Sequence, residues 1–170
     1  MDHNDLYIEK GNYKIRRLLE TEALLYKTLR LEAISEEPAM FRCSTPAEAG
    51  LTDSEWRERI KPPRIVFGLF VQDTPIGMTS IVLLNEQQGY LGQSYIRKAY
   101  RGLGLAALLY QVRMAWAARL QLKQLQVSHR ESNIISKAAN QRSGFVYSHR
   151  ETANWLDGTT EDVWYYTLDL

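Results

Sequence analysis

Residues 96–106 constrain the fold most, because they have the pattern of a strand end, a tight glycine turn and the first turn of a helix. Gly102 and Gly104 lack a Cβ, so the backbone there can turn sharply and an anion can approach its N–H groups. The first four N–H groups of a helix have no partner within the helix, and its dipole favours negative charge beside them. The stretch therefore predicts a phosphate-binding corner. On two glycines alone, a simple connecting turn is an equal alternative.

Two familiar phosphate loops do not fit this stretch. No Gly-Lys-Ser/Thr follows the glycines, as it would in a nucleoside-triphosphate loop, and the third glycine of a dinucleotide fingerprint is missing. The spacing Arg101-x-x-Gly104-x-Ala106 resembles the Arg/Gln-x-x-Gly-x-Gly/Ala signature of the GNAT family of N-acetyltransferases. The residues before it also resemble the family's passage from strand to loop, although Lys98 stands where a proline is common.

A second motif lies downstream at the distance that this resemblance requires. Asn133-x-x-Ser136 is followed by Gly144-Phe145. In the GNAT family an asparagine, a small residue three positions on and a Gly-Phe pair about eleven positions on form the next helix and strand, which is the order seen here. Two motifs in the right order, separated by one predicted helix and one predicted strand, are far more specific than either motif alone.

The resemblance implies a single α/β domain over residues 1–170, with a mostly antiparallel mixed sheet of about seven strands and about four flanking helices. Apolar periodicity predicts the same order of elements. Residues 1–11 are polar and predict a loose N-terminal tail. In the family the sheet parts between its fourth and fifth strands, here residues 90–97 and 122–129. The other predicted strands span 13–18, 65–71, 76–84, 145–155 and 162–169, and the helices 21–35, 52–60, 105–120 and 133–143.

Composition limits the partners. A net charge of +1 gives no electrostatic reason to expect nucleic acid. Cys43 is the only cysteine, which excludes an intrachain disulfide and a thiolate metal cluster, and no histidine or carboxylate cluster has metal-ligand spacing. The first residues lack a secretory signal pattern, and the longest apolar run, residues 65–71, is too short to cross a bilayer. We expect a cytoplasmic protein without metal or membrane partner.

The resemblance implies that acetyl-coenzyme A is the co-substrate and that the glycine corner holds its diphosphate. Arg101 adds charge there, unless its side chain only faces solvent. Asn133 matches the position that meets the pantetheine arm and also suits a helix cap, and one residue can do both. The Ile96 N–H is the expected donor to the thioester carbonyl oxygen. The expected cofactor-binding residues are Ser94, Tyr95, Ile96, Arg101, Gly102, Leu103, Gly104, Leu105, Ala106, Asn133 and Ser136, of which Ser136 fits helix packing better than a ligand contact.

The proton transfers have no obvious carriers. Many family members place a tyrosine seven residues after the Asn133 position, near the sulfur, where this chain has Asn140. An amide cannot donate a titratable proton at neutral pH. Residues 90–95 contain no carboxylate, although some members carry a glutamate on this strand. His129, at the predicted end of its strand, is the candidate base, with a hydrogen-bonded structural histidine as the alternative. Glu131, His149 and Tyr95 are weaker candidates.

The acceptor site is the least defined part of the sequence. The resemblance places the region of the first two predicted helices over the acceptor pocket, so Met40, Phe41 and Trp56 are candidate substrate contacts. Packing against the sheet is the alternative for each of them. Polyamines, amino acids, antibiotics, amino sugars and protein N-termini all stay open as acceptors, and the near-zero net charge argues only weakly against an acidic cleft for polyamines.

Three functions are compatible with these patterns. The paired motifs favour an acetyl-coenzyme A-dependent N-acetyltransferase, in which a primary amine of a small molecule or peptide attacks directly in a ternary complex. Asn140 and the missing strand carboxylate favour a non-catalytic acyl-coenzyme A sensor or partner-recognition module. An acyltransferase with a longer acyl donor is also compatible. A homodimer formed through an exposed sheet edge or helix is consistent with the sequence but not indicated by it.

Overall fold

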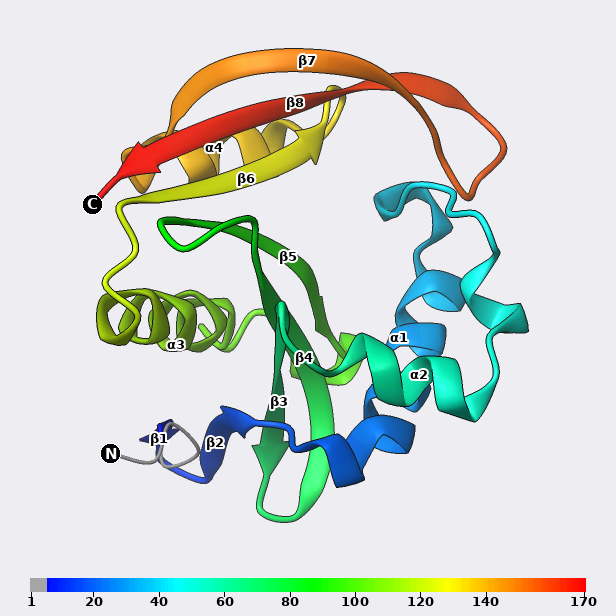
Figure 1. Cartoon of the computed structure of the whole chain (residues 1–170), viewed down its shortest axis with the longest axis vertical. Helices are drawn as coiled ribbons and strands as arrows, with labels where there is room; N and C mark the ends of the chain where they lie inside the picture. The colour runs from blue at the N-terminus through cyan, green and yellow to red at the C-terminus, as the bar shows by residue number, and fades with distance from the viewer. Residues whose placement is uncertain (1–5) are drawn as a thin grey trace.

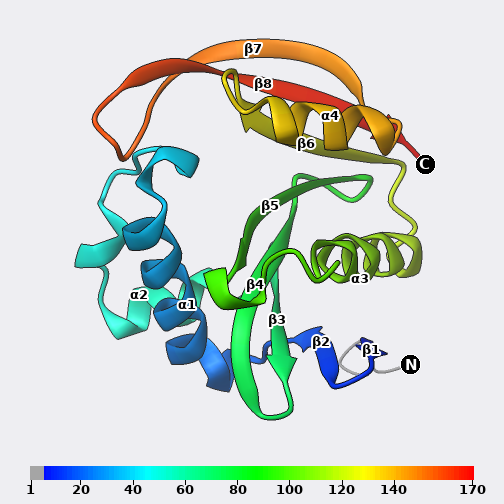
Figure 2. The same ribbon diagram turned by 180° about the vertical axis from the view of Figure 1, so that it is seen from behind.

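The computed structural model describes residues 6–170, which form one eight-stranded sheet with helices on both faces (Figures 1 and 2). The strand order is β1-β2-β3-β4-β5-β6-β8-β7, and all neighbours are antiparallel except β5 and β6. The strands are β1 (Tyr7–Lys10), β2 (Tyr13–Arg17), β3 (Arg64–Val71), β4 (Thr74–Leu83), β5 (Gln88–Ile96), β6 (Gln124–Arg130), β7 (Val146–Asn154) and β8 (Thr160–Asp169). The α-helices are α1 (Ala23–Glu36), α2 (Asp53–Arg59), α3 (Ala106–Arg119) and α4 (Ile134–Arg142).

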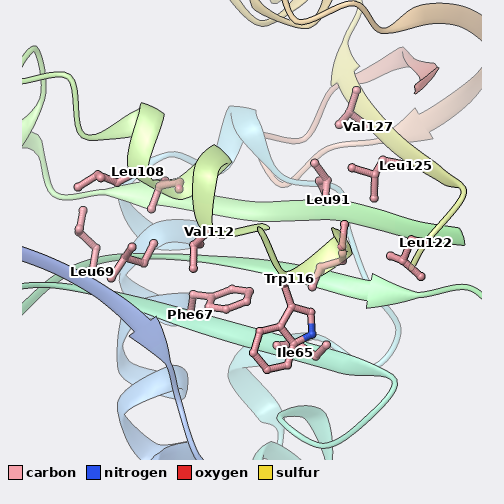
Figure 3. Close-up of a cluster of buried hydrophobic side chains, with 14 of the residues drawn as sticks. Ile65, Phe67, Leu69, Leu91, Leu108, Val112, Trp116, Leu122, Leu125 and Val127 are labelled. Atoms are coloured by element: carbon pink, nitrogen blue, oxygen red, sulfur yellow. The ribbon is translucent and has the colours of Figure 1, made fainter. Parts of the chain in front are cut away.

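Two apolar layers cover the sheet, because strand side chains alternate between its faces. The face that packs against α3 carries Phe67, Leu69 and Leu91, which surround Trp116 and Val112 of the helix (Figure 3). We name this the α3 face, and α4 covers its continuation over β6. The opposite face packs against α1 and α2 and forms the second buried cluster. We name it the α1 face; its buried residues are Leu18, Ala23, Tyr26, Leu29, Ala33, Leu51, Trp56, Ile60, Val66, Phe70, Met78 and Tyr95.

The sheet parts between β5 and β6. Their ladder joins only residues 88–90 to residues 124–126, and the rest of the two strands diverge. A register shift in the β4–β5 ladder accompanies the parting, with Ser80 opposite Gly92 and Met78 opposite Tyr95. Gln93, inside this bulge, has a φ of 55°, a backbone conformation that residues other than glycine rarely adopt. The predicted parting of strands 90–97 and 122–129 is therefore confirmed, as is the predicted α/β architecture with a mostly antiparallel mixed sheet.

The N-terminal prediction is wrong in part. Residues 7–10 are not a loose tail but strand β1, which pairs with β2 through a turn at Gly11 (φ 60°) and Asn12. The strand was missed because Glu9 and Lys10 interrupt its apolar pattern, and cross-strand pairing outweighs that local signal. The sheet accordingly has eight strands rather than seven. Residues 1–5 of the predicted tail lie outside the described residues.

The helix signals are mostly confirmed. Thr52 caps α2 with a complete capping box involving Glu55, and Gly144 (φ 88°) follows α4 in the left-handed conformation. The first helix differs from the prediction at its start, since Thr21 lies within a short 3-10 turn and Glu22 is the residue before α1. Among the described residues, no helix is long and apolar enough to span a membrane.

Candidate functional site

A cavity of about 860 Å³ occupies the gap between β5 and β6, and the residues that line it come from elements on both faces of the sheet. On the α3 face, the cavity wall is formed by residues of α3 and α4 and by the β6 side chains that lie on that face. From the α1 face its wall is formed by the ends of β3 to β5 and by the segment after α1. The first group includes Ala106, Leu109, Arg113, Val127, Asn133, Ser136 and Asn140, and the second includes Met40, Phe41, Arg42, Arg64, Ser80, Val82 and Tyr90.

The glycine corner before α3 is open. Gly102 and Gly104 have φ values of 77° and 78°, a conformation that glycine adopts without strain. A Cβ at position 102 would meet nothing within 4 Å, and one at position 104 would meet only the Lys10 Nζ at 3.7 Å. The space beside both glycines is thus open, and the Lys10 ammonium places a positive charge next to Gly104. This corner fits a diphosphate.

The Arg101 side chain turns away from that corner. Its Nε donates to the Ile96 carbonyl oxygen at 2.8 Å, and one terminal nitrogen lies 2.6 Å from an oxygen of Glu37. The guanidinium therefore ties the loop to the end of β5 and to the segment after α1. We assign Arg101 a positioning role, because Glu37 already balances its charge.

The end of β5 presents backbone donors to the gap. Arg97 N donates to the Ile76 carbonyl at 2.8 Å across the β4 edge. Since successive N–H groups of a strand point in opposite directions, the Ile96 N–H points away from β4, toward the gap. Residues 94–96 lie beyond the last β5–β6 pair, so no β6 carbonyl takes their N–H groups. Tyr95 itself packs on the α1 face, where its hydroxyl donates to Glu32 at 3.0 Å; burial, with Glu32 adding to it, raises its pKa to about 12.

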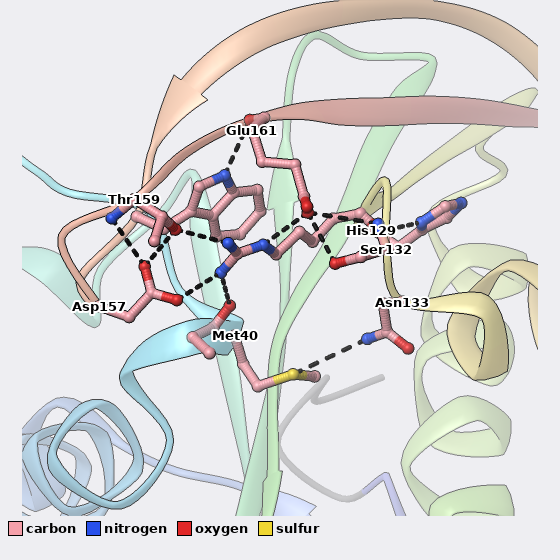
Figure 4. A network of polar contacts seen from close by, with 10 residues as sticks. Met40, His129, Ser132, Asn133, Asp157, Thr159 and Glu161 are labelled. Atoms are coloured by element: carbon pink, nitrogen blue, oxygen red, sulfur yellow. Dashed lines mark hydrogen bonds and ion pairs between the residues drawn. The ribbon is translucent and has the colours of Figure 1, made fainter.

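The first turn of α4 borders the same gap. The Asn133 side-chain oxygen accepts from the Ser136 N–H at 3.1 Å and so caps the helix. Its amide nitrogen lies 3.8 Å from the Met40 sulfur across the cavity (Figure 4). Asn133, Ser136 and Asn140 all line the cavity, at one-turn intervals along α4. Asn133 is therefore a cap that also faces the cavity.

His129 is buried, and both of its ring nitrogens are engaged. Nδ1 lies 2.6 Å from the Arg130 carbonyl oxygen and Nε2 lies 2.9 Å from the Tyr166 hydroxyl. A carbonyl can only accept, so Nδ1 carries the proton and Nε2 accepts from Tyr166. This arrangement leaves no free lone pair for a base, although His129 borders the cavity. Glu131 lies 3.6 Å from Arg150, and His149 stacks on Tyr165; neither is among the residues that line the cavity.

A segment after α1 closes one end of the gap, and we name residues 38–43 the strap. Arg42 forms a bridge with Trp155, Leu156 N donates to the Phe41 carbonyl at 2.9 Å, and Cys43 N donates to the Asn154 carbonyl at 2.8 Å. The strap thus pairs with the turn between β7 and β8, although more than 100 residues separate the two segments (Figure 1).

Arg130, at the end of β6, holds the strap and the β7–β8 turn together. Its guanidinium donates to Glu161 at 2.6 Å, to Asp157 at 2.8 Å and to the Ala39 carbonyl oxygen at 3.0 Å (Figure 4). It also donates to the Thr159 hydroxyl and stacks on Trp155. Sequence reasoning missed this residue, because its partners come from two segments that are distant in the sequence, the strap and the stretch from the β7–β8 turn into β8.

Arg42 of the strap lies inside the cavity wall on the α1 face. Its two terminal nitrogens donate to the hydroxyls of Tyr165 at 2.6 Å and Tyr90 at 3.1 Å. Tyr90 in turn shares a hydrogen bond with the Ser128 hydroxyl of β6. Burial raises the pKa of Tyr165, so this hydroxyl stays neutral. No local signal in the sequence could have identified this cluster.

The two aromatic acceptor candidates have different locations. Phe41 lines the cavity, with the Arg30 guanidinium 4.6 Å from its ring centre, and Met40 lines it as well. Trp56 is fully buried in the α1-face cluster, where it packs edge-on against Tyr26 at 5.3 Å. The prediction of a substrate contact by Trp56 is therefore wrong, because its ring fills the core between α1 and α2.

The sequence profile of the acetyltransferase (GNAT) family matches residues 29–145, which is most of the chain. The chain belongs to the GNAT family. The match spans the glycine corner, strands β5 and β6, and the α4 motif. No curated protein matches the sequence significantly.

Solved structures of GNAT acetyltransferases share the fold at low identity. RimL, a ribosomal L7/L12 alpha-N-protein acetyltransferase in complex with coenzyme A, has 17% identity and a TM-score of 0.73, covering 97% of this chain and 98% of its own. The ribosomal-protein-S5-alanine acetyltransferase from Vibrio fischeri has 16% identity and a TM-score of 0.76, covering 97% of both chains. The microcin C7 self-immunity acetyltransferase MccE, in complex with acetyl-CoA and AMP, has 13% identity and a TM-score of 0.70, covering 95% of this chain and 94% of its own.

Proposed function

We propose that this GNAT protein transfers an acetyl group from acetyl-coenzyme A to a primary amine of a small molecule or peptide, by direct attack in a ternary complex. The cavity in the parted sheet carries this proposal, because its lining includes Ala106, the first residue of α3 and next to the glycine corner, on one face and a separate wall on the other. Two reactants that enter from opposite faces would meet in the gap between β5 and β6. Holding both in a fixed orientation is itself a large part of such catalysis.

The backbone supplies most of the proposed cofactor contacts. The N–H groups of residues 102–106, with the Lys10 ammonium nearby, would bind the diphosphate. The N–H groups of Ser94 and Ile96 and the amide of Asn133 would align the pantetheine arm along the gap. Acetyl-coenzyme A supplies a thioester-activated acetyl group. The Ile96 N–H would donate to its carbonyl oxygen, where negative charge develops as the amine attacks.

Water would carry the protons. The reaction forms a C–N bond and breaks the C–S bond, while the amine loses one proton and the thiolate can gain one. His129 has no free nitrogen, and the Asn140 amide cannot donate a titratable proton. Because a thiol has an ordinary pKa of about 8.5, a thiolate is only a mildly unfavourable leaving group near neutral pH. With no side-chain carrier among these residues, water in the cavity would take the proton of the amine.

Two measurements test this function. Isothermal titration with coenzyme A and acetyl-coenzyme A should show one binding site per chain, and a panel of primary amines should give acetylation read as free-thiol release. Binding without thiol release from any amine would favour the non-catalytic sensor instead. Absence of binding would contradict both functions.

A further inference from the structure

The charge on the α1-face wall of the cavity is uneven. The lining residues include Arg30, Arg42 and Arg64 on that face, and Glu37 is the only carboxylate among the described residues that line the cavity. Glu37 is paired with Arg101 at 2.6 Å and so does not balance the wall. This face therefore presents an excess of positive charge to whatever enters it.

The arginines that line the cavity differ in whether a carboxylate is paired with them. Arg30 is paired with the buried Glu48 at 2.7 Å, and Arg130 is paired with Asp157 and Glu161. Arg42 forms no ion pair with a carboxylate anywhere in residues 6–170, and its hydrogen-bond partners are the neutral hydroxyls of Tyr90 and Tyr165. The surroundings of this half-buried guanidinium favour its charged form, since the effect of burial is outweighed by Tyr90 and Tyr165 together, which raise the pKa of Arg42, and no carboxylate takes up the charge.

The surroundings hold Arg42 in place. The two terminal nitrogens of Arg42 donate to Tyr165 of β8 and to Tyr90 of β5, on either side of the gap, and the bridge to Trp155 fixes the Arg42 backbone. Tyr165 does not line the cavity, whereas Arg42, Tyr90 and Ser128 do. Because Tyr90 accepts from Arg42, its own hydroxyl proton is free to be donated elsewhere, to Ser128 or to a ligand. The cluster is thus a preorganised set of donors on the acceptor side.

We propose that Arg42, supported by Tyr90, Tyr165 and Ser128, binds an anionic group of the acceptor, so that the preferred acceptor is an amine that also carries a carboxylate or a phosphate. This inference rests on the proposed acetyltransferase function and names its substrate class. A polyamine is disfavoured, because a second ammonium would lie against the same arginines. The positive wall also lowers the pKa of a nearby ammonium, which favours the neutral amine that attacks. A lower pKa of the acceptor ammonium reduces the need for a side chain that acts as a base.

The test uses pairs of acceptors that differ only in the anionic group. An α-amino acid is compared with its amide, and O-phosphoethanolamine is compared with ethanolamine, which separates carboxylate from phosphate recognition. For at least one pair, kcat/KM from thiol release should be about tenfold or more higher for the anionic member, the size expected for a charge-assisted hydrogen bond. In Arg42→Gln that ratio should fall close to one, and Arg42→Lys should recover part of it.

Control variants keep the test specific to the cluster. Arg150→Gln removes the same charge from the exposed strand β7, outside the cavity, and should leave the ratio unchanged. Tyr165→Phe should lower the ratio only a few fold, since it removes a support of Arg42 and not the charge. The coenzyme A affinity and the thermal unfolding of each variant show whether it is folded.

The outcomes separate this proposal from the proposed function. If the neutral amines are acetylated as well as their anionic partners, the acceptor proposal is wrong and the acetyltransferase function stands. If Arg42→Gln keeps the wild-type preference, the anion is bound elsewhere and the role of Arg42 is overturned. If no amine of either kind is acetylated although coenzyme A binds, both proposals fail.

Discussion

The parts of the cavity wall on the two faces of the sheet, which we call the α3-face mouth and the α1-face mouth, are built in different ways. The proposed cofactor contacts of the α3-face mouth are mostly backbone groups, namely the N–H groups of residues 102–106 and of Ile96, with the Asn133 side chain beside them. The α1-face mouth is made of side chains from the strap, β5, β6 and β8, with Arg42 at its centre. A backbone site can serve one constant ligand whatever the neighbouring side chains are. A side-chain site can change its ligand with a few substitutions.

The contrast predicts that the two mouths respond to different substitutions. Changes of backbone conformation should damage cofactor binding and leave acceptor preference intact. Changes in the strap and its supports should do the opposite. A single substitution should change both coenzyme A affinity and acceptor preference only where the side chain contacts both mouths, as Arg101 does through Ile96 and Glu37.

Gly104→Val should have the largest effect. At a φ of 78° a β-branched residue is strained by roughly 1–2 kcal/mol, and its side chain would stand where the diphosphate is proposed to bind. We expect coenzyme A affinity, measured by calorimetry, to fall at least about tenfold, because charge-assisted hydrogen bonds are lost.

Gly158→Val is the matched control for this substitution. Gly158 has a φ of 86° in the β7–β8 turn, and a Cβ there would meet nothing within 4 Å. It should lose a similar amount of unfolding free energy while its coenzyme A affinity changes by less than about twofold, as expected for strain away from the ligand. Equal loss of affinity in both variants would mean that strain alone, not the corner, explains the result.

Arg130→Met should have the next largest effect after Gly104→Val, and it should act on the α1-face mouth. It removes the donors that hold Asp157, Glu161 and the Ala39 carbonyl, and we expect a loss of about 2 kcal/mol in unfolding free energy. The strap should loosen, so the acceptor KM should rise several fold while coenzyme A affinity stays nearly constant. A parallel loss of coenzyme A affinity would show that the two mouths are not independent.

Asn133 offers a finer separation of cap and ligand contact. Asn133→Ala should cost about 1 kcal/mol of stability through the lost cap. Asn133→Ser keeps a capping oxygen but removes the amide, so thermal unfolding should return toward the wild type while coenzyme A affinity stays a few fold weaker. If Asn133→Ser restores both, the side chain acts only as a cap.

The sequence was informative where function depends on local backbone geometry. The spacing of Gly102, Gly104 and Asn133 predicted the corner, the helix start and the cap, because each is decided within a few residues. It was uninformative about Arg42 and Arg130, whose partners come from strands that the fold brings together. Trp56 shows the same limit, since only packing against Tyr26 distinguishes a core tryptophan from a substrate contact.

Acid should give the smallest of these effects, again on the acceptor side. Hydrogen bonds from the Thr159 hydroxyl, together with Arg130, lower the pKa of Asp157 to about 2. Its folded pKa is below its unfolded value near 4, so its contribution to stability is present above pH 4 and is lost as the pH falls through 4 toward 2. The difference in Tm between wild type and Asp157→Asn should shrink over that range. A constant difference would contradict this role for the carboxylate.

The most direct test of the account is hydrogen exchange with and without coenzyme A. The backbone corner and the end of β5 should become protected, with the strongest slowing at the amides of Ile96 and residues 102–106 and in the first turn of α4. The strap and the β7–β8 turn should change little until an acceptor is added. Protection confined to the strap, or none at all in residues 94–106, would contradict the claim that the cofactor is held by the backbone on the α3 face.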